Sequence, residues 1–251
     1  MTKRLPARSR FGEGRGFIAV TLTRASGAFT FFKGNILSRR IAMIYLPKDP
    51  FNVIIGGVGG QGNVLASQIL GEMLVAKGYV ITIGETYGAS QRGGSVMSHL
   101  RVSEREPFSP LIPEGQADLL IALEPVEGLR ILAPYGNPKI MTLLNTRPIH
   151  PIDVISGNAT YPEVSRVIAK IQELSRRVWT LNATEIALEM GDPIFANIVM
   201  LGALSAINVL PIDRQVFESV IRDLLPSRSM DENLRAFERG GEVVEEFHPV
   251  R

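Results

Sequence analysis

The stretch that decides the fold is FNVIIGGVGGQGNVLASQILGEMLVAKGYVITIGE, residues 51–85. It begins with a short β-branched run, passes through a glycine-rich turn into an apolar run of helical length that ends at Gly78, and closes with a second β-branched run. Strands and helices that alternate in this way are typical of α/β folds, because each helix carries the chain back to the start of the next strand. We therefore predict that residues 51–85 form a strand, a helix and a strand.

The same alternation continues along the chain. Four further apolar runs are predicted strands: residues 95–102, 118–123, 139–145 and 176–182. Predicted helices lie near residues 125–133, 161–175 and 182–190, over the almost wholly apolar stretch 192–210, and on either side of Pro226. The sequence thus predicts an open, mainly parallel Rossmann-like sheet flanked by helices, with further helices at the C-terminal end, in one domain over residues 43–251.

Composition excludes several classes of protein. The chain has 251 residues, of which 45% are hydrophobic, enough to bury a core without a disulfide or a structural metal. It contains no cysteine, which removes a thiol nucleophile and the usual ligands of an iron–sulfur cluster. The three histidines, His99, His150 and His248, are far apart and form no metal-binding motif. We therefore predict no metal site.

The first 42 residues differ from the rest of the chain. They carry nine lysines or arginines and one acid, a charge of +8, so the body carries 2 − 8 = −6. Their apolar runs are too short for a secretory signal or a membrane span, and their Arg-rich composition resembles a mitochondrial transit peptide without its amphipathic helix. Because Met43 opens a natural domain start, a start codon placed too early is the simpler explanation. We expect residues 1–42 to be a disordered or non-native extension, and we expect no binding to nucleic acid or membrane.

The turn GGVGGQG at residues 56–62 has the GxGxxG spacing between a predicted strand and a predicted helix. Glycines there allow a tight turn and let an anion approach the helix N-terminus. Glu85 ends the second strand, where a dinucleotide-binding protein places the acid that holds a ribose. A free-standing NAD- or flavin-dependent oxidoreductase is therefore one hypothesis. The other is that the glycines only make a close strand-to-helix turn.

A second glycine-bearing loop follows at residues 86–94, around the single cation Arg92. Loops that leave neighbouring strands at the carboxyl edge of an open α/β sheet form the usual ligand site. We predict a polar ledge there, and the sequence leaves the catalytic residues unknown. The candidate binding residues are Gly57, Gly59, Gly60, Gln61, Gly62, Arg92, Gly93 and Gly94.

Other polar residues receive structural roles. Glu124 and Glu127 flank Pro125 at a predicted helix start, where acids interact favourably with the helix dipole. His99 is interpreted as a packed or surface residue of its strand. Asn197 lies in the apolar stretch, where an unpaired buried amide costs about 1–3 kcal/mol, so we expect it to hydrogen-bond in the core or across an interface.

Several motifs together resemble the gamma-type subunits of the 2-oxoacid:ferredoxin oxidoreductases. These motifs are GVGGQG at 57–62, ETYGASQRGGSV at 85–96, SPLIPEGQADLLIALEP at 109–125, LNTRPI at 144–149, NIVMLGAL at 197–204 and ENLRAFERG at 232–240. The resemblance runs in order over roughly residues 51–247. The wording SQRGGSV favours the branch of the family that acts on indolepyruvate.

The resemblance implies a subunit of a cytoplasmic complex that oxidatively decarboxylates an aryl 2-oxoacid, with coenzyme A as acyl acceptor and ferredoxin as electron acceptor. It implies that a large alpha subunit carries thiamine diphosphate and the [4Fe-4S] clusters, that this chain alone binds no cofactor, and that the isolated chain is inactive. The phosphates of coenzyme A would suit the turn at residues 59–62 and Arg92. An equal alternative is that the turn is a docking edge that meets only a subunit. A purely structural scaffold with a basic interaction arm stays open as a third hypothesis.

Overall fold

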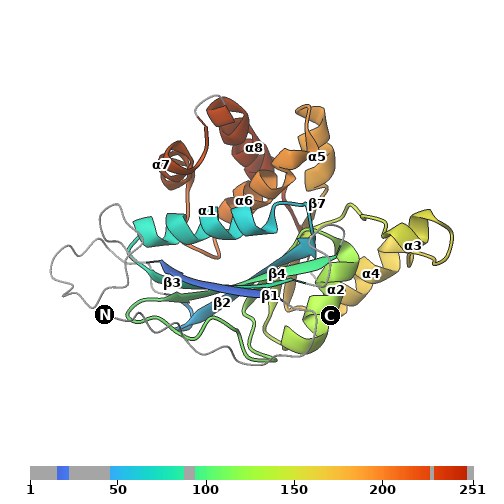
Figure 1. The fold of residues 1–251 in the computed structure, drawn as a ribbon, viewed down its shortest axis with the longest axis horizontal. Coiled ribbons are helices and arrows are strands. Elements are labelled where there is room, and N and C mark those ends of the chain that lie inside the picture. The colour runs from blue at the N-terminus through green and yellow to red at the C-terminus, as the bar shows by residue number, and fades with distance from the viewer. Residues whose placement is uncertain (1–15, 23–45, 88–93, 227–228, 248–251) are drawn as a thin grey trace, which may run out of the picture.

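The fold is an eight-stranded sheet between two layers of helices, as seen in a computed structural model that describes residues 16–22, 46–87, 94–226 and 229–247 (Figure 1). The order across the sheet is β1-β3-β4-β2-β5-β6-β7-β8. The strands are β1 Gly16–Leu22, β2 Phe51–Val58, β3 Val80–Tyr87, β4 Ser95–Ser103, β5 Leu119–Ala122, β6 Met141–Asn145, β7 Arg177–Leu181 and β8 Glu245–Phe247.

The directions of the strands confirm the predicted fold class. Strands β2, β5, β6 and β7 are parallel neighbours, and β3 points the same way because both it and β2 pair antiparallel with β4. Among the described strands, β1, β4 and β8 run the opposite way. Five of the eight described strands therefore point the same way, and the sheet is mainly parallel in direction. Strand β4 lies between β2 and β3, the two strands that α1 connects, and the sequence did not predict this insertion.

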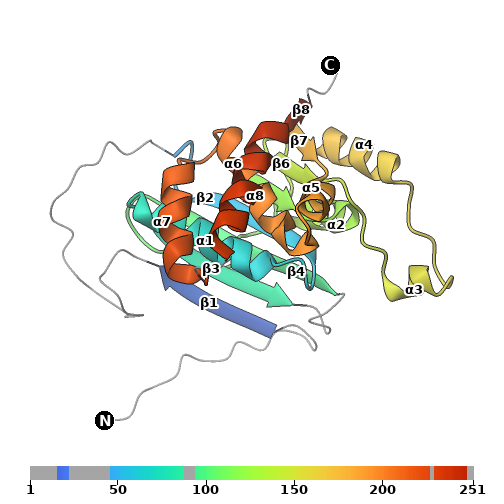
Figure 2. The same ribbon diagram turned by 90° about the horizontal axis from the view of Figure 1, so that it is seen from above.

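One face of the sheet carries five helices, which Figure 2 shows from above. They are α1 Asn63–Ala76, α5 Ala183–Glu189, α6 Ala196–Ala206, α7 Arg214–Leu224 and α8 Met230–Val243. The helix predicted over 192–210 is shorter than expected, because a 3₁₀ turn, η1 Pro193–Phe195, precedes α6. The two predicted C-terminal helices are confirmed, and they lie on either side of Pro226. Together these helices bury the larger apolar core, which includes Val53 and Ile55 of β2.

The other face is covered partly by helices and partly by loop. Helices α2 Pro125–Tyr135 and α4 Val164–Leu174 pack with Ile54, Leu120 and Leu144 from the strands in a second core. The segment 104–118 lies against the β3–β4 side, where a Cβ added at Gly84 would come within 2.9 Å of the Pro110 carbonyl oxygen. Strand β2 is buried from Phe51 to Gly57 because both faces are covered.

Two glycines let α6 and α8 cross in backbone contact. A Cβ added at Gly202 would lie 1.8 Å from the carbonyl oxygen of Phe237, and one at Gly240 would lie 1.8 Å from that of Val199. Neither position has space for any side chain, so the crossing depends on both glycines.

Part of the N-terminal extension belongs to the sheet. Residues Gly16–Leu22 form β1, which pairs antiparallel with β3. Residues 1–15 and 23–42 lie outside the described part of the chain, so the origin of the extension stays a prediction. Within the described ranges, every helix is too short or too polar to cross a membrane.

Candidate functional site

The glycine-rich turn lies where β2 ends and α1 begins, at the carboxyl edge of the parallel strands. Gly60 and Gly62 have positive φ values of 109° and 78°, a region that side chains rarely occupy. Gly62 is the N-cap of α1, and no side chain caps this helix. The first N–H groups of a helix have no partner within it, so this turn offers them, and the positive end of the dipole, to an anion.

The predicted binding residue Gln61 directs its side chain into the protein. Its Oε1 accepts from the backbone N–H of Val58 at 2.7 Å, and its Nε2 donates to the carbonyl oxygen of Leu123 at 2.7 Å. Gly57 is needed for the same packing, because a Cβ there would lie 2.5 Å from Gln61 Oε1. The structure therefore gives Gln61 and Gly57 the task of shaping the turn and joining β2 to the end of β5.

Two asparagine side chains hydrogen-bond to backbone carbonyl groups of the turn. Asn63 Nδ2 donates to the carbonyl oxygen of Val58 at 3.2 Å, and Asn197 Nδ2 donates to that of Gly62 at 3.2 Å. The second bond confirms the expectation that Asn197 hydrogen-bonds in the core. The Oδ1 atoms of both asparagines are buried without a partner in the structure.

The two glycine-bearing loops meet, as the ledge hypothesis requires. The backbone N–H of Gly59 donates to the carbonyl oxygen of Gly94 at 2.7 Å, because β4 begins beside the end of β2. Arg92 and Gly93, two further candidates, lie outside the described residues. Of the candidate residues, the structure therefore joins the turn that holds Gly59, Gly60 and Gly62 to Gly94 through Gly59, and we call these four residues the ledge.

Glu85 does not lie where a ribose-binding acid would. It is 5% exposed, and its Oε1 accepts from Ser67 Oγ at 3.0 Å and from Ser98 Oγ at 3.4 Å. Since β4 separates β3 from β2, the carboxylate is enclosed between α1, β3 and β4 instead of bordering the glycine turn. The suggestion that Glu85 holds a ribose is therefore wrong, and the dinucleotide-dependent alternative has no support.

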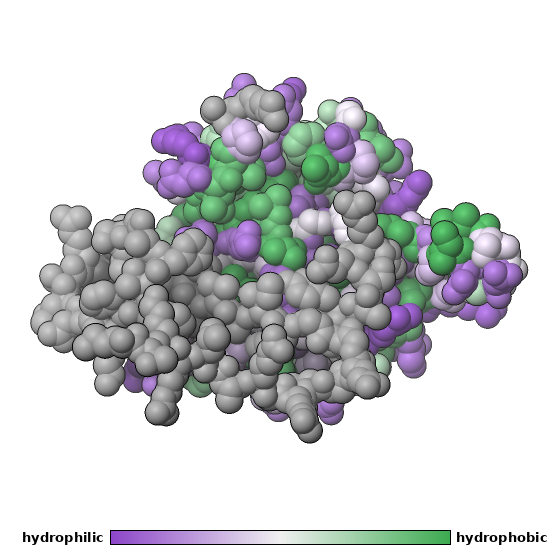
Figure 3. All heavy atoms as spheres, in the orientation of Figure 1, coloured by the Kyte–Doolittle hydropathy of each residue, from purple (hydrophilic) through white to green (hydrophobic). Residues whose placement is uncertain are grey.

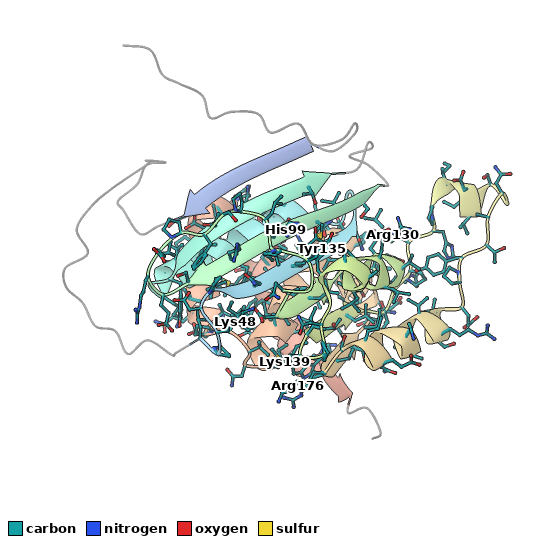
Figure 4. The ribbon with its side chains drawn as sticks, turned by 90° about the horizontal axis from the view of Figure 1, so that it is seen from below. Lys48, His99, Arg130, Tyr135, Lys139 and Arg176 are labelled. Carbon is teal, nitrogen blue, oxygen red and sulfur yellow. The ribbon has the colours of Figure 1, made fainter. Side chains whose placement is uncertain are left out.

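His99 is a packed core residue, as the sequence indicated. Its side chain is fully buried, its Nδ1 accepts from the backbone N–H of Ile112 at 3.4 Å, and its ring meets the Tyr135 ring edge-on with centroids 5.3 Å apart (Figure 4). Burial, followed by the nearby Arg101 guanidinium, lowers the pKa of His99 to about 4. The imidazole is therefore neutral at physiological pH and contributes no charge to the site.

Glu124 makes contacts that sequence reasoning missed. The expected role is confirmed for this residue, because Glu124 is the N-cap of α2 and its Oε2 accepts from the backbone N–H of Glu127 at 2.8 Å. In addition, Glu124 Oε1 accepts from the Tyr161 hydroxyl and, at 3.4 Å, from the backbone N–H of Ile149. No local pattern links these positions, since 37 residues separate Glu124 from Tyr161.

Neither the sequence nor the described structure suits a resident metal cluster. The chain has no thiolate to offer, and no group of three or more His, Asp or Glu in the described ranges is placed to hold an ion. Among the residues that the structure describes, the site is a hydrogen-bonded turn with an uncapped helix start at the edge of an α/β sheet, a geometry that suits an anion.

Comparison with known proteins assigns the family. Residues 52–243 match the model of the pyruvate ferredoxin/flavodoxin oxidoreductase family. A curated relative, the indolepyruvate oxidoreductase subunit IorB of Archaeoglobus fulgidus, is 39% identical over 189 residues, which cover 75% of this chain and 92% of the relative. The chain belongs to this oxidoreductase family.

Solved structures agree on the fold. The pyruvate oxidoreductase subunit PORC of Thermotoga maritima is similar with a TM-score of 0.59 at 21% identity, over 80% of this chain and 100% of that one. A 2-oxoglutarate:ferredoxin oxidoreductase from Magnetococcus marinus, solved with 2-oxoglutarate, coenzyme A and succinyl-CoA bound, gives a TM-score of 0.62 at 19% identity. The match covers 81% of this chain but only 33% of that longer chain.

Proposed function

We propose that this chain is the beta, gamma-type subunit of an indolepyruvate ferredoxin oxidoreductase. The complex converts an aryl 2-oxoacid, coenzyme A and oxidised ferredoxin to the arylacetyl-CoA, carbon dioxide and reduced ferredoxin. The observation that carries the proposal is the 39% identity with a protein named as an indolepyruvate oxidoreductase subunit, over nearly the whole length of that protein. The match of residues 52–243 to the family model supports it.

The division of labour follows from the residues that are present. Thiamine diphosphate stabilises the carbanion formed on decarboxylation and iron–sulfur clusters carry the electrons, and we place both on a large alpha subunit. A chain without cysteine suits the subunit that holds no cluster. We expect the isolated chain to be inactive and the complex to lie in the cytoplasm.

The part of the reaction that we assign to this chain is reception of coenzyme A. Its phosphates would lie against the uncapped start of α1 at Gly60 and Gly62, with Arg92 and the Gly93–Gly94 backbone beside them. Gly57, Gly59 and Gln61 would keep the turn in shape, since their contacts are to the protein itself. In this proposal the chain binds and orients a co-substrate, and the partner performs the chemistry.

The subunit proposal is tested by anaerobic co-purification from the native host. A tagged chain is expected to bring down a large, cysteine-containing, thiamine-binding partner, and the eluate is expected to reduce ferredoxin only with both indolepyruvate and coenzyme A present. The chain alone is expected to show no activity and no micromolar binding of NAD or flavin. A lone protein that retains a nucleotide would contradict the proposal.

The coenzyme A assignment is tested separately with Arg92→Ala in the assembled complex. Loss of one charge-assisted hydrogen bond costs about 1.5–3 kcal/mol, so the KM for coenzyme A should rise roughly 10- to 150-fold while the KM for indolepyruvate stays unchanged. Arg105→Ala is the control, because Arg105 is an exposed arginine just beyond the opposite end of β4. An unchanged coenzyme A dependence in Arg92→Ala would refute the assignment.

A further inference from the structure

The connection between β6 and α4 projects from the body of the protein. We call residues 149–163 the projecting arm; it contains the single-turn helix α3 Ile152–Ile155. Figure 1 shows α3 to the side of the sheet, and Figure 2 shows it standing away from the other helices. Every residue of the arm is exposed except Val154 and Tyr161, which are half-buried. The arm therefore lacks the packing that normally holds a loop of this length in place.

The tip of the arm is shaped by its own backbone. The carbonyl oxygen of Asp153 accepts from the N–H groups of Asn158 at 2.8 Å and Ala159 at 3.0 Å, while Ile155 N donates to the Pro151 carbonyl at 3.1 Å. These bonds fold the chain back directly after α3. The tip is thus a compact turn whose hydrogen bonds are made within the arm itself.

This tip presents two large apolar side chains to solvent. Ile152 is 78% exposed and Ile155 is 73% exposed, and their spacing puts them on the same side of the helical turn. Figure 3 shows hydrophobic residues gathered at this tip. In the arm, Asp153 is the one fully charged side chain at the tip, and Glu163 is a second acid at the base where the arm ends. An exposed apolar cluster of this kind marks an interaction site.

The base of the arm is held by a single buried carboxylate. Glu124 is 1% exposed, and its Oε1 accepts both from Ile149 N, where the arm leaves the body, and from the Tyr161 hydroxyl, where it returns. Burial and then the hydrogen bond to Glu124 raise the pKa of Tyr161, so the phenol keeps its proton and stays a donor. Both ends of the arm are therefore fixed to one point.

Glu124, which anchors the base of the arm, is also connected to the glycine-rich turn. Glu124 directly follows Leu123, whose carbonyl oxygen accepts from Gln61 Nε2 at 2.7 Å. Asn145 at the end of β6 donates to the same carbonyl at 3.0 Å, shortly before the arm begins. The arm and the turn thus leave the same edge of the sheet and share hydrogen-bonded residues.

We propose that the projecting arm is a docking element that places Ile152 and Ile155 in an apolar pocket of the large, thiamine diphosphate-carrying subunit. This inference rests on the proposed function. Because the arm and the turn share one edge, the same docked subunit would lie over the coenzyme A turn. The near absence of charge at the tip suits the apolar core of an obligate interface.

The choice of the large subunit as occupant has support in the lengths of the chains. The matched fold makes up 33% of the Magnetococcus marinus chain, so in that enzyme other parts of the same polypeptide accompany this fold. The PORC subunit of Thermotoga maritima, in contrast, matches this chain over its whole length. When a chain consists of little more than this fold, as PORC does, a separate subunit would supply the parts that the longer chain carries itself. The interface between this chain and the large subunit would then be permanent. A permanent interface would keep Ile152 and Ile155 covered, which explains why the free chain exposes them.

The test is the double variant Ile152→Ser/Ile155→Ser in the full-length chain. Its affinity for the separately purified large subunit is measured anaerobically by biolayer interferometry and compared with that of the wild type. We expect the Kd to rise at least tenfold, with the far-UV circular dichroism and thermal midpoint of the isolated chain unchanged, because both side chains are exposed. The double variant should lower the activity of the complex at equal subunit concentrations, and an excess of the large subunit should restore it, because weaker binding is overcome by mass action.

The control is Leu224→Ser, which removes an exposed leucine at the end of α7, away from the arm in Figures 1 and 2. It should bind as the wild type does. If the wild type binds the large subunit and the double variant binds equally well, the docking inference is wrong and the proposed function stands. If the wild type does not bind it, both are wrong. A change in self-association with unaltered binding to the large subunit would make the arm a contact between copies, which also overturns the inference.

Discussion

The crossing of α6 and α8 gives the sharpest prediction for stability. In Gly240→Ala the added Cβ would lie 1.8 Å from the carbonyl oxygen of Val199 and 2.7 Å from its carbon. An ordinary contact begins near 3.4 Å, and the opposing atoms are backbone, so the two helices must move apart. Alanine favours the helix by about 1 kcal/mol over glycine, whereas forcing an extra carbon into a packed core costs about 1–3 kcal/mol, and more where a rigid backbone is displaced.

The neighbouring glycine provides a matched control. A Cβ at Gly241 would meet the Gly202 carbonyl oxygen at 3.6 Å and Ala206 Cβ at 3.7 Å, both ordinary contacts. Gly241→Ala should therefore be neutral or stabilise by up to about 1 kcal/mol, while Gly240→Ala should lower the free energy of unfolding by about 3 kcal/mol and the midpoint by roughly 6–12 °C. Urea and thermal unfolding of the isolated chain measure both. Equal stabilities of the two variants would refute the close crossing.

Three further predictions concern the site and its surroundings. Gly62→Ala should destabilise more than Gly60→Ala in urea unfolding: both incur about 1–2 kcal/mol of left-handed backbone strain, but only at Gly62 does the new Cβ approach Asn197 Nδ2, to 2.3 Å. The pKa of His99 is about 4 in the folded chain and about 6.5 in the unfolded chain. Between these pH values the unfolded chain binds a proton that the folded chain does not, so the free energy of unfolding of the wild type should fall as the pH drops from 6.5 to about 4. In His99→Gln this pH slope should be reduced, and an identical slope would contradict the assignment. Tyr161→Phe should cost about 1–3 kcal/mol in thermal unfolding, because Glu124 Oε1 loses its hydroxyl donor while buried; a change below about 0.5 kcal/mol would mean that the carboxylate is not held there.

Local patterns were sufficient for most elements. Short apolar runs, β-branched in β2 and β3, located β2 to β7, and Pro226 correctly separated the last two helices. The glycine turn could also be predicted, because the positive φ values at Gly60 and Gly62 are ones that glycine adopts without strain.

Strand order could not be predicted, and this affected Glu85. The sequence of strands along the chain suggested that β3 follows β2 in the sheet, which would put Glu85 beside the glycine turn. Pairing of β4 between them encloses the carboxylate with Ser67 and Ser98 instead. Strand pairing depends on contacts between residues distant in sequence, so no local pattern encodes it.

The sequence by itself determined the α/β class, the glycine turn between strand and helix and, through its ordered motifs, the family. The tertiary structure decided which polar groups face a ligand and which face the protein. Gln61 belongs to a binding motif in the sequence, yet its amide is used between Val58 and Leu123. Glu124 begins a helix in the sequence, yet it also fixes both ends of the projecting arm. The physical reason is that a buried polar group must find a hydrogen-bond partner, and the available partners are known only once distant segments have packed together.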